Sequence, residues 1–193
     1  MRLMTTQPTP DAQLMALVAQ GDQAAFSALV KRHLPRAYAI ARRTLSSDSE
    51  AEDAAQEAFS KIWVNARDYK PEKAAFTTWL HRIVVNASLD MARKKRPMAV
   101  EDEVLHAVAD TRDNAEQQLS DDEQAQQVQA AIAALPAQQR AAITLCYTEE
   151  YSNAEAASML GIHIKALEGL LVRARKSLRS KLGEMKKGAR DAA

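Results

Sequence analysis

Two stretches of the sequence concentrate side chains that bind polyanions. Residues 81–96 hold five cationic residues against one aspartate, and residues 161–193 hold nine against three acidic residues. The first stretch ends the run AAFTTWLHRIVVNASLDMARKKR (74–96), in which aromatic residues and an asparagine precede four consecutive cationic residues. Each phosphate neutralised by Lys or Arg releases counterions, so two cationic stretches indicate a polyanion contacted at two places. Solvated helix ends, where the helix dipole favours cations, explain the same charge equally well.

Catalytic chemistry has little support in the sequence. Four histidines, at positions 33, 81, 106 and 163, are scattered without the spacing of metal ligands. A glycine-rich phosphate loop and a nucleophile elbow are both missing. An enzyme acting on nucleic acids would need a carboxylate cluster or metal ligands, and neither is visible. We therefore expect no catalytic residue, no metal, no cofactor and no small-molecule substrate.

The elements that position the cationic residues are expected to be helices. Apolar residues recur at spacings of three and four, strand-like alternation is missing, and the 193 residues include only five glycines. This pattern predicts an all-α protein. The expected helices span residues 11–19, 22–44, 49–66, 75–95, 122–134, 137–147, 153–160 and 164–185.

An acidic segment divides the chain. The apolar period fades after Pro97, and residues 101–123 hold nine acidic residues against Arg112, a net charge of −8. This composition predicts two small helical domains, residues 11–96 and 122–187, joined by a flexible acidic linker, residues 97–121. No apolar run reaches the length of a signal peptide or a membrane-spanning helix, so we expect a cytoplasmic protein.

The second domain has the pattern of a helix-turn-helix. Ser152 and Glu155 form a capping box at the start of a short helix, and Gly161 supplies the turn after it. In the next helix one buried stripe is predicted at Ile164, Leu167, Leu171, Ala174 and Leu178. The opposite side of that helix is basic, as insertion into a DNA major groove requires. An ordinary helical hairpin is the alternative.

Three motifs extend this interpretation over nearly the whole chain. The first, residues 52–63, reads EDAAQEAFSKIW, and the second, residues 76–93, reads F-x-x-W-L-x-x-I-x-x-N-x-x-x-D-x-x-R. The third runs through residues 135–175, with Leu-Pro, Arg140, Ser-x-x-Glu, Leu-Gly and Arg-x-Arg. In this order the motifs resemble those of the bacterial sigma-70 family of RNA polymerase sigma factors. With only two domains, the chain is similar to the compact extracytoplasmic-function group.

The resemblance implies a protein that binds core RNA polymerase, directs it to specific promoters and assists promoter melting. The helix 49–66 is expected to bury an inner stripe formed by Ala51, Ala55, Phe59, Ile62 and Trp63. The residues that would grip the polymerase lie on its outer side. They are Asp53, Gln56, Glu57 and Lys61. A solvated helix face is the more ordinary meaning of such residues.

The resemblance also implies that Asn86 receives a base flipped out of the non-template strand at the minus-10 element. Its amide offers a donor and an acceptor to one base edge, whereas a buried asparagine would need partners inside the protein. Single strands are held by aromatic stacking and a cationic track. Tyr69 or Phe76 would stack on the bases. The cationic track would be formed by Arg93, Lys94, Lys95 and Arg96. The apolar face of this helix, including Trp79 and Leu80, is expected to be core.

Minus-35 recognition cannot be transferred directly from the family. Where the family usually reads Thr-Val-x-Ser-Arg-Leu, residues 166–171 read ALEGLL, so a common basic contact is missing. A glycine within a helix also costs about 1 kcal/mol relative to alanine. The candidate contacts that remain are His163, Lys165, Arg173, Arg175 and Lys176.

The expected partners are core RNA polymerase, promoter DNA and an anti-sigma factor, in a response to stress. The DNA would be double-stranded at the minus-35 element and single-stranded at the minus-10 element. The inhibitory partner would wedge between the two domains, and the acidic linker would either imitate RNA phosphate or serve as a solvated spacer. A stand-alone helix-turn-helix regulator is the alternative function, although it would leave the motifs of residues 52–93 without a role.

Overall fold

The chain folds into helices throughout the part that the computed structural model describes, which is residues 9–95 and 121–191, with side chains for 9–95 and 125–183. Arg96 and residues 97–120 of the expected linker lie outside it. The first group of helices is α1 (Asp11–Val18), α2 (Gln23–Leu45), α3 (Asp48–Val64), the 3₁₀ turn η1 (Ala66–Asp68) and α4 (Phe76–Lys95). The second is α5 (Asp121–Ala133), α6 (Ala137–Ile143), the π-helical turn η2 (Thr144–Thr148), α7 (Asn153–Leu160) and α8 (Ile164–Asp191). The all-α expectation is confirmed for these residues.

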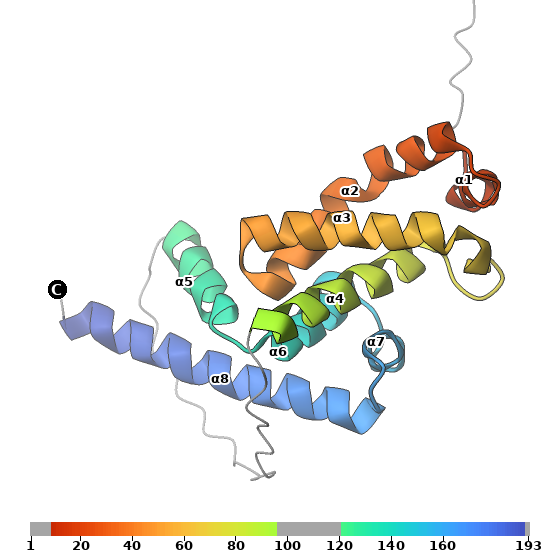
Figure 1. Cartoon of the computed structure of the whole chain (residues 1–193). Coiled ribbons are helices and arrows are strands. Elements are labelled where there is room, and N and C mark those ends of the chain that lie inside the picture. Colours follow the sequence, from red (N-terminus) through yellow and green to blue (C-terminus); the bar gives the residue numbers. More distant parts are fainter. Residues whose placement is uncertain (1–8, 96–120, 192–193) are drawn as a thin grey trace, which may run out of the picture.

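The first domain is built around α2, α3 and α4, which run alongside one another (Figure 1). α3 buries Ala51, Ala54 and Ala58, which recur at three and four residues on its inner side. Small side chains at these positions let the neighbouring helices approach closely. Leu80 and Val84 of α4 complete the core, and the opposite side of α3 is left to solvent.

The second domain packs α6 and α7 against the first half of α8, with Leu145, Leu167 and Leu171 in its core. The expected helix over residues 137–147 is divided in two, because α6 ends at Ile143 and the wider turn η2 follows. η2 ends immediately before the segment that contains Glu149 and Tyr151, two residues that contact the first domain.

The two domains are in direct contact. α6 lies against α2 and α4, and α7 lies against α4 (Figure 1). Within residues 9–95 and 121–191, no helix is both long and apolar enough to span a lipid bilayer. Over the same part of the chain, no group of three or more His, Cys, Asp or Glu side chains is arranged to hold a metal ion.

Candidate polymerase and promoter interfaces

The outer side of α3 presents the four residues expected to contact polymerase. Asp53 and Gln56 are exposed, while Glu57 and Lys61 are partly exposed and form an ion pair of 2.7 Å at a spacing of four residues. The alanines on the inner side of α3 fix this orientation. A partner that approaches α3 therefore meets a carboxylate and an amide first, and can compete for the Glu57–Lys61 pair.

An apolar surface adjoins this polar row at the end of α3. Trp63, expected in the inner stripe of the helix, is 37% exposed. Its ring meets Phe26 of α2 edge-on, with ring centroids 5.0 Å apart. The apolar stripe identifies which side of a helix faces the core, but not the point along the helix where the neighbouring helix stops covering that side. The sequence therefore does not predict the exposure of Trp63.

The aromatic residues expected near the minus-10 strand gather where α4 begins. Tyr69 lies over Trp79 and Phe76, with ring centroids 5.3 Å and 6.0 Å away. The Tyr69 hydroxyl donates a hydrogen bond to the Ala74 carbonyl (3.3 Å), which closes the loop before α4. Phe76 is only 2% exposed. Of the two rings expected to stack on a base, Tyr69 is therefore the more accessible, and Phe76 packs against it from the core.

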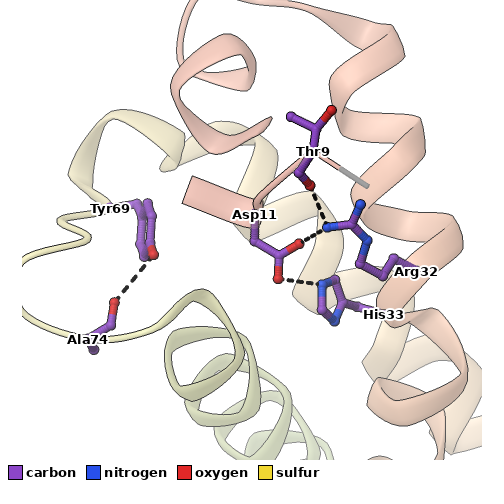
Figure 2. Close-up of polar contacts among 6 residues, drawn as sticks. All are labelled: Thr9, Asp11, Arg32, His33, Tyr69 and Ala74. Carbon is purple, nitrogen blue, oxygen red and sulfur yellow. Dashed lines mark hydrogen bonds and ion pairs between the residues drawn. The ribbon is translucent and has the colours of Figure 1, made fainter. Parts of the chain in front are cut away.

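α1 and α2 brace this aromatic cluster from a second side. The Asp11 carboxylate accepts hydrogen bonds from Arg32 and from Nε2 of His33, the latter at 2.9 Å, and Arg32 also donates to the Thr9 carbonyl (Figure 2). The His33 ring in turn contacts Phe76, with centroids 5.1 Å apart. The start of α1 is thus tied, through His33, to the ring that supports Tyr69.

The cationic end of α4 is solvent-accessible as far as it is described. Arg93, Lys94 and Lys95 are exposed at the C-terminus of the helix, where the helix dipole favours positive charge. Arg93 pairs with Asp90 on the same helix and Lys95 with Glu50 of α3. Exposed pairs of this kind contribute about 0–1 kcal/mol, so phosphate can compete for both cations.

Asn86 lies between the aromatic loop and this cationic end, and it is covered by the second domain. Its Nδ2 donates a hydrogen bond to the carbonyl of Met159 in α7 (3.2 Å), and the side chain is only partly exposed. This bond engages one of the two Nδ2 hydrogens, and α7 lies against α4, so the amide is not free to pair with a base edge. We call this arrangement, in which α7 contacts α4, the closed arrangement. In it the residue expected to read the minus-10 element is held by α7.

A buried polar cluster fastens the two domains near Asn86. Glu149, whose side chain is 2% exposed, pairs with Arg36 of α2 (2.8 Å), and Tyr151 is hydrogen-bonded to Nδ1 of His81 (2.9 Å). His81 Nδ1 also lies 3.6 Å from the Glu149 carboxylate. Burial, aided by the charges of Arg36 and His33, lowers the pKa of His81 to about 4. His81 is therefore neutral at pH 7, and the ion pair in this cluster is that of Arg36 with Glu149.

Arg140, a motif residue with no role expected from the sequence, provides a second fastening. Its buried guanidinium donates to the Thr44 carbonyl (2.7 Å) and the Leu45 carbonyl (3.4 Å) at the end of α2. It also donates to the carbonyls of Ala133, the last residue of α5, and Leu135, in the turn before α6. One side chain thus satisfies carbonyls at two helix ends that belong to different domains.

The helix-turn-helix forms as the sequence predicts. The Ser152–Glu155 capping box starts α7, and Gly161 ends it in the left-handed conformation, with φ of 66°. Leu167, Leu171 and Ala174 are buried and set the rotation of α8, but Ile164, expected in the same stripe, is 47% exposed. As the first residue of α8, Ile164 projects beyond the edge of the domain core. The five candidate minus-35 contacts are all exposed: His163, Lys165, Arg173, Arg175 and Lys176.

Comparison with known families identifies both domains. The family model of sigma-70 region 2 matches residues 29–97, and that of sigma-70 region 4 matches residues 125–178. The ECF RNA polymerase sigma factor SigM of Mycobacterium tuberculosis is 36% identical over 180 residues, which cover 92% of this chain and 87% of SigM. The ECF RNA polymerase sigma factor SigW of Bacillus subtilis is 33% identical over 177 residues, covering 87% of this chain and 94% of SigW.

Solved structures show the same architecture. The structure of CnrH in complex with the cytosolic domain of CnrY aligns with a TM-score of 0.60 at 29% identity, covering 90% of this chain and 97% of CnrH. The sigma factor RpoE in complex with the anti-sigma factor NepR from Bartonella quintana gives a TM-score of 0.58 at 26% identity, covering 82% and 96%. The chain therefore belongs to the sigma-70 family, within its extracytoplasmic-function group, and is a transcription initiation factor that directs RNA polymerase to promoters.

Proposed function

We propose that the chain holds core RNA polymerase through the outer row of α3, formed by Asp53, Gln56, Glu57 and Lys61. The observation that carries this proposal is the division of α3 into a buried alanine side and an exposed polar side. Nothing inside the described protein requires Asp53 or Gln56. The exposed Trp63 beside the row adds apolar area. Protein interfaces commonly combine an apolar centre with polar residues around it.

The proposal is tested by replacing Asp53 and Glu57 with lysine and measuring retention of core polymerase on the immobilised chain. Both side chains reach solvent, so helicity and melting temperature should barely change while polymerase binding is lost. Lys70→Glu, a charge reversal at an exposed residue away from α3, is the control and should bind normally. Undiminished retention of polymerase by the double mutant would remove this assignment.

At the minus-10 element, Asn86 reads a flipped base, Tyr69 stacks on the strand while the buried Phe76 supports it, and Arg93, Lys94 and Arg96 contact the strand's phosphates. The partly exposed amide of Asn86 supports the first role, because it lies outside the buried face of α4 and its described hydrogen bond is to α7 and not to its own domain. Its hydrogen bond to Met159 implies that α7 must leave α4 before the base enters. Separation of the domains is therefore part of promoter binding.

At the minus-35 element, α8 enters the major groove and uses the exposed residues around its first half. His163, Lys165, Arg173, Arg175 and Lys176 all reach solvent in the closed arrangement. A stand-alone helix-turn-helix regulator would share this surface but would not bind core polymerase. Gel filtration of the chain with core polymerase distinguishes the two functions.

An anti-sigma factor is the proposed regulatory partner, since CnrH was solved in complex with the cytosolic domain of CnrY and RpoE in complex with the anti-sigma factor NepR. In place of the wedge between the domains expected from the sequence, the partner would stabilise the arrangement in which α7 covers Asn86, because the two domains are already in contact. The chain itself would catalyse no reaction and would work in the cytoplasm, beside the polymerase. An uninduced chain that copurifies with no other protein and is fully active in cells would contradict sequestration.

A further inference from the structure

We propose that Glu168 determines base preference in the minus-35 element by accepting a hydrogen bond from an exocyclic amino group, that of cytosine or adenine. The inference rests on the proposed entry of α8 into the major groove. It assigns a specificity role to one of the residues at which this chain departs from the usual family pattern.

Glu168 is unusual on its helix because of its charge. Among the described side chains of α8, residues 164–183, it is the only acidic one and stands against six cationic ones. It is exposed, and its carboxylate has no ion pair or hydrogen bond with any described residue, including Lys165 one turn before it. It lies beyond the first turn of α8, so it does not cap the helix either. Nothing in the fold requires this carboxylate.

The position of Glu168 is suited to reading bases. Burial of Leu167 and Leu171 points the opposite side of α8 away from the core. Glu168 and Val172, four residues apart, are therefore neighbours on the exposed surface, and Val172 is 59% exposed. Both lie in the first three turns of α8. Recognition helices contact base edges with residues near their N-termini.

The chemistry of a carboxylate then limits which bases it can face. An ionised carboxylate only accepts hydrogen bonds, and in the major groove only cytosine N4 and adenine N6 donate them. Guanine O6 and thymine O4 would face it as acceptors and be repelled. A phosphate would be repelled as well, so Glu168 weakens the interface unless it meets an amino group.

Neighbouring residues complete a mixed reading surface. Arg173 lies over Gly169: a Cβ placed at Gly169 would be 3.5 Å from Arg173 Nη1. This guanidinium is a donor, suited to guanine O6 and N7, and the exposed Val172 is suited to the methyl group of thymine. An acceptor, an apolar group and a donor are thus presented side by side. A helix that bound phosphates alone would need only the donor.

The test is to measure binding of the reconstituted holoenzyme to duplexes in which each minus-35 position carries all four bases in turn. The wild-type chain should favour cytosine or adenine at one position by roughly 5- to 150-fold. Glu168→Ala should abolish that preference and leave the others unchanged, and Glu168→Lys should favour guanine or thymine there. Glu150→Gln, which removes an exposed acid just before α7, is the matched charge control and should leave every preference as it is.

Two results would overturn the inference. If Glu168→Ala strengthens binding to all duplexes equally and steepens the salt dependence, Glu168 is a repulsive charge and not a reader. If Glu168→Ala keeps the wild-type preference at every position, another residue reads the amino group. A wild-type holoenzyme without any minus-35 preference would instead overturn the proposed role of α8, and this inference with it.

Discussion

Asn86→Ala should have two effects of opposite sense, because the Asn86 amide has a role in each of two states. In the closed chain it donates one hydrogen bond to the Met159 carbonyl at 3.2 Å. A typical hydrogen bond contributes about 0.5–1.5 kcal/mol net. The substitution should therefore favour separation of the domains by roughly 2- to 12-fold. Energy transfer between dyes on α1 and at the end of α8 would report this opening in the free chain.

On the promoter the same substitution removes the proposed base contact. Loss of a specific pair of hydrogen bonds to a base costs about 1–3 kcal/mol on the preferred sequence. In the proposed mechanism the domains are already apart on the promoter, so the gain from opening does not offset this loss. Asn86→Ala should therefore weaken open-complex formation and flatten preference at one minus-10 position, with the salt dependence unchanged.

Lys176→Ala is the matched comparison, because Lys176 is exposed on α8 and offers only a point charge. It should weaken all minus-35 sequences alike and reduce the slope of log affinity against log salt concentration by about 1. Holoenzyme binding to a panel of minus-10 and minus-35 variants at several salt concentrations measures both substitutions. If Asn86→Ala lowers affinity for every minus-10 variant equally and reduces the salt slope, Asn86 holds phosphate and the base-reading assignment is wrong.

Three further predictions concern folding and assembly. Arg140→Met should lower the free energy of unfolding in urea by about 2–4 kcal/mol, because it leaves the carbonyls of Thr44 and Leu45 without their donor; unchanged stability would contradict the fastening role. The pKa of His81 is about 4 when folded and 6.5 when free, so only the unfolded chain takes up a proton between these values. Stability should fall by up to about 1.4 kcal/mol per pH unit as pH drops through that window and stay flat above it, and His81→Gln should remove the slope. Reversing Asp53 and Glu57 to lysine should abolish polymerase binding, as measured by retention of core polymerase.

Local features were predictable from the sequence because short-range chemistry sets them. The Ser152–Glu155 capping box and the left-handed Gly161 both stand where their residue types required them. The helix identities follow from apolar spacing alone. Ile164 and Trp63 show the limit of this reasoning, since a stripe marks one side of a helix but not how far the neighbouring elements extend along it.

Contacts between the domains were not predictable, because no periodicity connects residues so far apart in the chain. Asn86 and Met159 are 73 residues apart, and Arg36 and Glu149 are 113 apart. Arg140 stood out in the sequence as part of a motif, but its acceptors are backbone carbonyls, which carry no residue-type signal. Nothing in one sequence distinguishes an arginine that binds DNA from one that satisfies helix ends.

The proposed mechanism is that one chain directs polymerase to a promoter with two separate DNA-reading surfaces. Site-specific crosslinking within a promoter complex is its most direct test. Photoreactive residues would replace Asn86 in α4 and Val172 in α8, and the complex would be trapped on a promoter before elongation. Position 86 should crosslink to the non-template strand at the minus-10 element, and position 172 to the minus-35 duplex of the same molecule. Crosslinking of position 86 to α7 in the active complex, with no crosslink to DNA, would show that the closed arrangement persists and would contradict the proposed mechanism.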